Sequence, residues 1–187
     1  FQQITTIIIA NARQIQPVAR QITQAINSRK NNILTALIPL LTDKDISVRF
    51  NATVSLGLIA DELATSYLIT QLSDGTALVR DAAAIALGNI GKSAVPQIEQ
   101  QFRREQNPRV RALLVESAGR TKDQSAERIL KSAVKDQHWL VRLAAVDALG
   151  TALPAKKAAG LAKYLVKDDN LTVQTRINRV FPQLTAK

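Results

Sequence analysis

Apolar residues recur along most of the chain every three or four positions, which is the spacing of an amphipathic helix. In the segment 33–41 these residues are Leu34, Leu37, Ile38 and Leu41. Polar residues fill the positions between them, so the segment is predicted to be a helix that buries one face. The same pattern predicts similar helices, which we call A helices, over 62–72, 93–105, 125–135 and 156–166.

A second helix, which we call the B helix, is predicted after each A helix. It carries a Val-Arg pair that recurs at a constant step of 31 residues, at Val48-Arg49, Val79-Arg80, Val110-Arg111 and Val141-Arg142. A glycine keeps the same step, at Gly57, Gly88, Gly119 and Gly150. A fixed period of this length is the signature of a repeat array. The predicted helix pairs are 32–60, 62–91, 93–122, 125–151 and a less regular pair at 156–184.

The residues before the B helices agree with this division. Asp45, Thr76 and Asn107 occupy one repeated position, and their side chains are suited to accept from the free amides of a first helical turn. His138 and Asn170 fill the same position in the last two pairs. The recurrent glycine either ends each B helix or lets neighbouring helices approach closely, and the sequence leaves both readings open.

Residues 1–30 lack the repeat pattern but keep helical spacing on either side of Pro17. They predict two helices, about 2–14 and 17–28, that cap the array. No Gly/Ser-rich or low-complexity break divides the chain, so residues 1–187 are predicted to be a single repeat domain.

The amino-acid composition excludes several kinds of functional site. The chain has no cysteine and one histidine, His138, which excludes disulfides, thiolate metal sites and multi-histidine metal sites within one chain. We therefore expect no metal and no cofactor. The net charge is +10, and residues 101–187 hold 17 of the 25 Lys and Arg. Such asymmetry makes binding of nucleic acid or another polyanion possible through the basic C-terminal half.

Membrane and targeting signals are weak. The apolar run Ile7–Ala10 is far too short for a membrane span or a signal peptide, so no membrane span is expected. The chain begins at Phe1 and has no methionine, and we expect a processed product or a fragment. The compartment is unassigned, with the cytoplasm as the default.

The repeats resemble HEAT repeats, in particular the short kind called phycobilisome-lyase HEAT-like repeats. The resemblance rests on Asp45, Val48-Arg49 and Ala52, and on Val141-Arg142, Ala144-Ala145 and Ala148-Leu149-Gly150, and it covers about residues 32–181. It implies an all-α fold, a right-handed α-solenoid of about five HEAT-like helix pairs plus the N-terminal capping helices. It also implies that the B helices line the concave face.

The resemblance further implies that the recurrent arginines Arg49, Arg80, Arg111 and Arg142 form a structural ladder by bonding to carboxylates in the turns. Acids suited to this role are Asp43 or Asp45, Asp74, Asp136, and Asp168 or Asp169. Amides stand at Gln106-Asn107, where weaker bonding is expected. The alternative is a strip of guanidinium groups that binds phosphates or acidic peptides.

Repeat proteins place specificity at positions that vary within a regular frame. On the B helices these positions give a set of candidate partner-binding residues: Phe50, Leu78, Arg109, Trp139, Leu140 and Leu143. Trp139, the only tryptophan, could anchor a partner or pack on the neighbouring turn. The alternative for the set is that half of it belongs to the core. No catalytic residue is recognisable, because His138 lacks an identifiable nucleophile and orienting carboxylate.

The sequence therefore predicts a non-catalytic scaffold that binds a protein partner on the concave B-helix surface. One alternative is a phycobilin lyase or a chaperone-type subunit that acts on a tetrapyrrole protein, because such proteins are built from these repeats. A second alternative is nucleic-acid or polyanion binding. The absence of any His-Glu pair argues against di-iron HEAT-like hydroxylases, and the scarcity of aromatic residues argues against HEAT-like DNA glycosylases.

Overall fold

The computed structural model describes residue 28 and residues 31–184. Contacts group the chain into two compact units, Phe1–Leu37 and Ile38–Lys187. In the first unit, residues 31–37 are helical. The helices predicted over 2–14 and 17–28 lie outside the described residues, except for Ser28. The second unit contains the recurrent Val-Arg pairs and the B helices that carry them.

Every regular element between residues 38 and 184 is helical, and this part of the chain contains no strand. The B helices are α3 (Ile46–Ile59), α5 (Ala77–Ile90), α7 (Pro108–Arg120), α9 (Trp139–Ala152) and α11 (Leu171–Val180). The A segments combine short 3-10 turns with helices. They are η1 (Ile38–Thr42), η2 (Glu62–Ala64) with α4 (Thr65–Gln71), η3 (Gly91–Ala94) with α6 (Val95–Arg104), η4 (Gln124–Ala126) with α8 (Glu127–Ala133), and α10 (Ala155–Ala162) with η5 (Lys163–Leu165). A last turn, η6, spans Pro182–Leu184.

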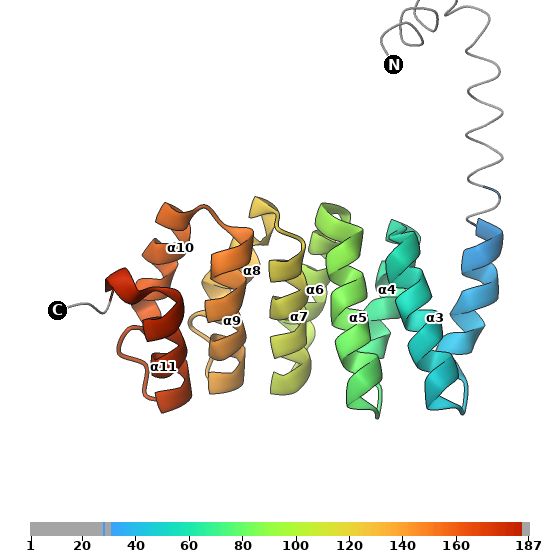
Figure 1. The fold of residues 1–187 in the computed structure, drawn as a ribbon, viewed down its shortest axis with the longest axis horizontal. Coiled ribbons are helices and arrows are strands. Elements are labelled where there is room, and N and C mark those ends of the chain that lie inside the picture. The colour runs from blue at the N-terminus through green and yellow to red at the C-terminus, as the bar shows by residue number, and fades with distance from the viewer. Residues whose placement is uncertain (1–27, 29–30, 185–187) are drawn as a thin grey trace, which may run out of the picture. The chain divides into compact units, whose positions relative to one another are not determined.

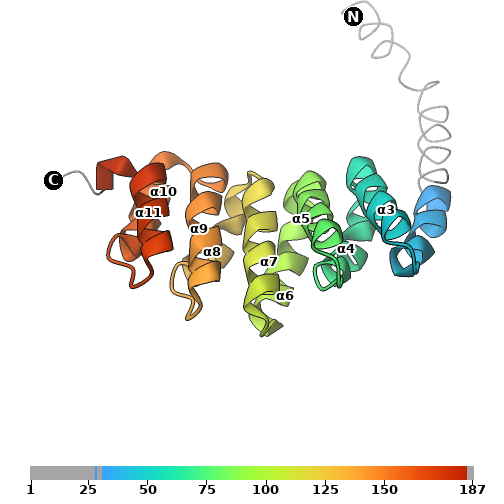
Figure 2. The same ribbon diagram turned by 60° about the horizontal axis from the view of Figure 1, so that its bottom comes forward.

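Consecutive B helices pack side by side, α3 on α5, α5 on α7, α7 on α9 and α9 on α11 (Figure 1). The A helices form a second layer against the B helices, with α4 on α5, α6 on α7 and α8 on α9, and they lie partly behind the B helices in the turned view (Figure 2). The predicted all-α repeat fold is confirmed. None of the described helices is long and apolar enough to cross a bilayer.

The core between the layers consists of aliphatic side chains that recur with the repeat. Leu56, Leu87 and Leu149 of the B helices and Leu68 and Leu130 of the A helices are fully buried. Neighbouring helix pairs therefore share a continuous aliphatic core, as expected for a repeat protein.

Small residues set how closely neighbouring B helices approach. Gly119 lies inside α7, and a Cβ atom built there would be 2.6 Å from the Cβ of Ala148 on α9. Gly57 meets Ala86 at the same distance. Of the two readings of the recurrent glycine, the structure therefore favours close packing at these positions. Gly150 is different, since the nearest atom to its added Cβ is 3.5 Å away, on Val180.

The repeated position before each B helix is an N-cap. The side chains of Asp45, Asn107 and Asn170 each accept from an amide of the first turn. His138 does the same, its Nδ1 accepting from the amide of Leu140 at 3.2 Å. Thr76 occupies the N-cap position, but its side chain makes no cap bond. Its hydroxyl instead accepts from Arg49 Nη2 at 3.4 Å.

Candidate partner-binding groove

The recurrent arginines join consecutive repeats at the turns before the B helices. Arg49 shows the pattern: its Nε donates to Asp74 Oδ2 at 2.8 Å and its Nη2 donates to Asp74 Oδ1 at 3.2 Å. Its Nη1 donates to the carbonyl oxygen of Asp43, six residues earlier, at 2.8 Å. One guanidinium thus holds its own turn and the next one, with the two-point geometry that arginine offers a carboxylate.

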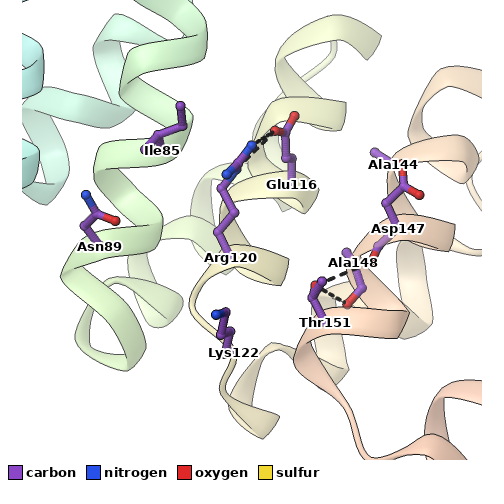
Figure 3. A pocket seen from close by; sticks show the side chains of 9 residues that line it. All are labelled: Ile85, Asn89, Glu116, Arg120, Lys122, Ala144, Asp147, Ala148 and Thr151. Atoms are coloured by element: carbon purple, nitrogen blue, oxygen red, sulfur yellow. Dashed lines mark hydrogen bonds and ion pairs between the residues drawn. The ribbon is translucent and has the colours of Figure 1, made fainter.

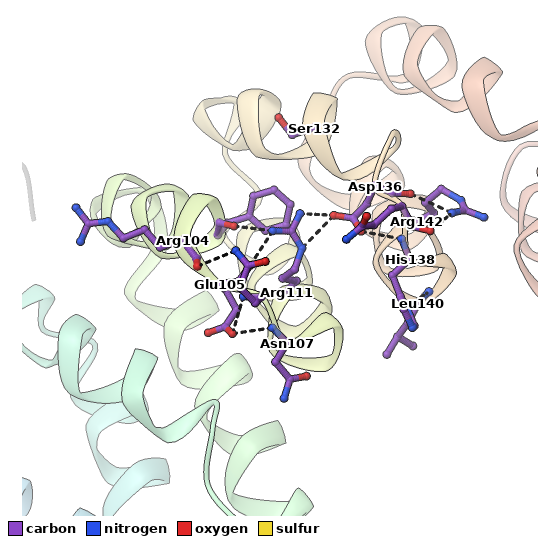
Figure 4. Close-up of polar contacts among 12 residues, drawn as sticks. Arg104, Glu105, Asn107, Arg111, Ser132, Asp136, His138, Leu140 and Arg142 are labelled. Carbon is purple, nitrogen blue, oxygen red and sulfur yellow. Dashed lines mark hydrogen bonds and ion pairs between the residues drawn. The ribbon is translucent and has the colours of Figure 1, made fainter.

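Arg111 and Arg142 repeat this arrangement further along the array (Figure 4). Arg111 donates to Asp136 and to the carbonyl oxygen of Glu105. It also lies over the ring of Phe102, with Cζ 4.3 Å from the ring centroid. Arg142 donates to both carboxylate oxygens of Asp168 and to the carbonyl oxygen of Asp136.

Two of these pairs, Arg49–Asp74 and Arg142–Asp168, lower the pKa values of their carboxylates. Burial raises the pKa of Asp74, but hydrogen bonds from Arg49 and Thr76 outweigh it and hold the pKa below its ordinary value. The pKa of Asp168 is lowered in the same way, with Arg142 and the amide of Asn170 opposing the effect of burial. The ionised carboxylates are thus stabilised in the folded protein.

Arg80 departs from the pattern. Its Nη1 donates to the carbonyl oxygen of Asp74 at 2.7 Å, as the other arginines do to the carbonyl six residues earlier. Among the residues that the structure describes, however, Arg80 makes no ion pair. The acid in the next turn is Glu105, which the sequence prediction overlooked in favour of Gln106-Asn107. Its Oε1 accepts from the amide of Asn107 at 2.9 Å, and its Oε2 accepts from Gln101 Nε2 at 3.2 Å.

Two adjoining hollows lie on the B helices α5, α7 and α9. The larger, of about 700 Å³ (Figure 3), is lined by Ile85, Asn89, Glu116, Arg120, Lys122, Ala144, Asp147, Ala148 and Thr151. The smaller, of about 440 Å³, is lined by Ala77, Arg80, Asp81, Arg109, Ala112, Leu113, Glu116, Leu140, Leu143, Ala144 and Asp147. Glu116, Ala144 and Asp147 line both. We call the combined surface the B-helix groove.

Three of the predicted partner-binding residues, Arg109, Leu140 and Leu143, come together in the smaller hollow. Leu78 on α5 is 54% exposed and lies outside the lining of both hollows. Phe50 on α3 is half-buried and also lies outside it.

Trp139 lies at the start of α9 and is 38% exposed. Its ring stacks on that of His138, with the centroids 6.0 Å apart. It does not line either hollow, whereas Leu140 and Leu143 both line the smaller one.

Sequence reasoning missed the centre of the groove. Ile85, Glu116 and Asp147 stand one repeat apart on three successive B helices and line the larger hollow together. The signal was present in the 31-residue register, because this position changes from apolar to acidic along the array. The sequence prediction instead chose the repeat position of Phe50 and Leu143 for partner binding.

Charges of both signs surround the groove. Glu116 accepts from Arg120 Nε at 3.1 Å and from Nη2 at 2.8 Å. Asp147 pairs with Arg176 Nη1 at 3.3 Å. Burial raises the pKa of Asp147 above its ordinary value, Glu116 adds to the effect, and Arg176 and Arg179 oppose it. The groove therefore offers apolar side chains between paired charges, a surface suited to a peptide segment of mixed character.

On the A-helix side, several basic residues of the C-terminal half are already paired. Lys131 and Lys157 both donate to Glu127 and hold its pKa at about 2, well below the ordinary glutamate value. Arg103 and Arg128 both pair with Glu99. These pairs reduce the positive field available to a polyanion.

A family model described as HEAT repeats matches residues 12–88 and 95–180. The chain belongs to the HEAT-repeat family. A second model, for the PBS lyase HEAT-like repeat, matches residues 79–102, which begin within α5 and include Arg80. The resemblance to HEAT repeats of the phycobilisome-lyase kind, which the Val-Arg and Ala-Leu-Gly residues indicate, is thus confirmed.

Among solved structures, the chain is similar to the complex of CpcE and CpcF of phycocyanin lyase from Nostoc sp. PCC7120. The identity is 25% and the TM-score 0.56, over 82% of this chain and 65% of that chain. Two lesser similarities are to an engineered protein (18% identity, TM-score 0.45, over 81% and 78% of the two chains) and to a designed armadillo repeat protein in complex with a (KR)4 peptide (15%, 0.43, over 94% and 95%). A search of curated proteins found no match.

Proposed function

We propose that this HEAT-repeat protein is a non-catalytic scaffold that binds a segment of a protein partner in the B-helix groove. The observation that carries the proposal is the pair of adjoining hollows on α5, α7 and α9, which share Glu116, Ala144 and Asp147. A contiguous groove across three repeats can bind an extended or helical segment.

Apolar groups in this groove can serve as anchors. Ile85 is 45% exposed on α5, and Leu143 is half-buried on α9. Binding would remove their remaining apolar surface from water, at roughly 25 cal/mol for each Å² covered. The helices that carry them are fixed by the aliphatic core and the arginine pairs, so the groove is preformed and little ordering cost opposes binding.

Variants in the groove test this function by affinity capture from a lysate of the source organism at low and high salt. Leu143→Asp and Ile85→Asp are expected to abolish capture of one defined protein at both salts. Leu63→Asp, at a 60% exposed position of η2 on the A side, is the matched control and should retain it. Loss with the control but not with the groove variants would overturn the proposal. Nucleic acid captured only at low salt would favour the polyanion alternative.

A second function, a lyase or chaperone-type subunit for a tetrapyrrole protein, is supported by the similarity to the phycocyanin lyase complex of CpcE and CpcF. That structure is a complex of two proteins, CpcE and CpcF, so a second protein that binds this chain would agree with this function as well. The test is to mix the protein with an apo-phycobiliprotein, with a bilin, and with both. Binding of either component, lost in Leu143→Asp, would favour this function, whereas absence of binding to both would exclude it.

A further inference from the structure

We propose that Arg80 recognises an acidic side chain of the bound partner segment, next to an apolar residue that enters the smaller hollow of the B-helix groove. The inference rests on the proposed function, because it names the chemistry of the segment that the groove takes. Its evidence lies in the difference between Arg80 and the other recurrent arginines.

The recurrent arginines divide their donors in a constant way. Nη1 of Arg49, Arg111 and Arg142 donates to the carbonyl oxygen six residues earlier, and the edge formed by Nε and Nη2 donates to an aspartate of the next turn. Arg80 keeps the first contact, with Asp74. Within the part of the chain that the structure describes, no acid meets its second edge. Arg80 is a half-buried residue, and its guanidinium thus retains the two donors that a carboxylate binds.

Glu105 explains why that edge is unused. The aspartates of the other turns cap their own turn with Oδ1, as Asp136 does for the amide of His138, and offer Oδ2 to the arginine. Glu105 keeps the cap, since its Oε1 accepts from the amide of Asn107. Its longer side chain carries the second oxygen to Gln101 on α6 instead. Glu105 therefore accepts the hydrogen bond of its own turn but leaves Nε and Nη2 of Arg80 available for another ligand.

The surroundings of Arg80 favour an acidic partner residue beside an apolar one. Arg80 lines the smaller hollow together with Arg109, which is exposed, and with the aliphatic groups of Leu140 and Leu143. Of the carboxylates in this hollow, Glu116 is paired with Arg120 and Asp147 with Arg176.

Asp81 is the remaining carboxylate of the hollow, and it makes no ion pair among the described residues. Arg80 and Arg109 carry two positive charges and Asp81 carries one negative charge, so the unpaired groups of the smaller hollow have a net positive charge. A carboxylate is attracted there, and the neighbouring leucines take the apolar residue.

A displayed library of random 12-residue peptides, selected on immobilised protein, tests the proposal. On the wild type we expect enrichment of Glu or Asp adjacent to a large apolar residue. A selected peptide and its Glu→Gln counterpart are then titrated against the wild type and Arg80→Ala. The glutamate peptide is expected to bind the variant about ten-fold more weakly, because a charge-assisted hydrogen bond is lost, while the glutamine peptide binds both alike.

Glu105→Asp is the most specific variant for this test, because Glu105 lines neither hollow of the groove. The shorter acid should meet Arg80 as Asp74 meets Arg49, and so withdraw the guanidinium from the peptide. We expect a higher melting temperature together with weaker binding of the acidic peptide. Arg80→Lys keeps the charge but lacks the two-point edge, and should bind more weakly than the wild type.

The outcomes separate this proposal from the proposed function. Peptides that depend on Leu143 but show no acidic preference would overturn the role of Arg80 and leave the groove as the binding surface. Acidic peptides that bind Arg80→Ala as tightly as the wild type would also overturn it. Selected peptides indifferent to both Leu143→Asp and Arg80→Ala would overturn both proposals.

Discussion

Arg142 and Asp168 lie in consecutive repeats, and the guanidinium of Arg142 donates two hydrogen bonds to the carboxylate of Asp168. Nε donates to Oδ2 at 2.6 Å, and Nη2 donates to Oδ1 at 2.8 Å. The Asp168 side chain is 3% exposed and that of Arg142 is 12% exposed. Removing one partner of such a pair leaves a buried charge without compensation, which typically costs about 3–5 kcal/mol.

Arg142→Ala is therefore expected to lower the free energy of unfolding by about that amount. Arg80→Ala is the matched comparison, because Arg80 has the same repeat position without an acid. It should cost only about 1 kcal/mol, the typical net contribution of the one hydrogen bond that it loses, to the Asp74 carbonyl. Urea denaturation of the two variants measures the difference. Equal losses would show that the carboxylate partner contributes nothing to stability.

A second prediction contrasts two glycines of the same repeat position. Gly119→Ala would place a Cβ 2.6 Å from that of Ala148, forcing α7 and α9 apart, and should cost about 1–3 kcal/mol. Gly150→Ala meets Val180 at an ordinary contact distance of 3.5 Å and should stabilise the protein by roughly 0.5–1 kcal/mol through helix propensity. Thermal melting distinguishes them, and a stabilising Gly119→Ala would contradict the close approach.

The arginine pairs also predict how stability changes with pH. The pKa values of Asp74 and Asp168 are lowered in the folded state. Their contribution to stability is thus complete above the unfolded-state aspartate pKa of about 3.9, and it is lost as the pH falls through the lowered folded-state values. Asp168→Asn should be much less stable than the wild type at pH 7, and the gap should narrow below about pH 4. A gap that is constant from pH 7 to pH 3 would contradict the assignment.

The cap of α9 gives a fourth prediction. His138 Nδ1 accepts from the amide of Leu140, so His138→Ala should lose about 0.5–2 kcal/mol. His138→Asn should retain the cap, as Asn107 and Asn170 do at α7 and α11. Thermal unfolding of the two variants measures the effect. If His138→Asn were as unstable as His138→Ala, the imidazole would act through its stack on Trp139 instead.

Much of the fold could be predicted from the sequence, because the repeat imposes one register on helices, caps and core. The B-helix starts follow from residues such as Asp45 and Asn107, whose side chains cap wherever the backbone presents free amides. The chemistry of Thr76 was harder to anticipate, because its hydroxyl is drawn to Arg49 from the preceding repeat. That competition depends on distances between repeats.

The candidate site was less predictable for the same reason. Whether Arg80 meets an acid depends on one methylene of Glu105 and on the presence of Gln101 nearby, a contact that spacing alone does not encode. Which B-helix positions line a hollow depends on how closely α5, α7 and α9 approach. Leu143 and Arg109 were identified from their variability, whereas Glu116 and Asp147 were not.

Site-specific photo-crosslinking shows whether a protein partner occupies the B-helix groove. A benzophenone amino acid at position 85 reports on the groove, and the same residue at position 67 of α4 is the control. Ile85 is 45% exposed and Tyr67 is 42% exposed, so the two probes meet solvent to nearly the same extent. We expect one defined protein to be crosslinked from position 85 and not from position 67. A partner crosslinked from position 67 alone would place binding on the A-helix side and rule out the groove as the binding surface.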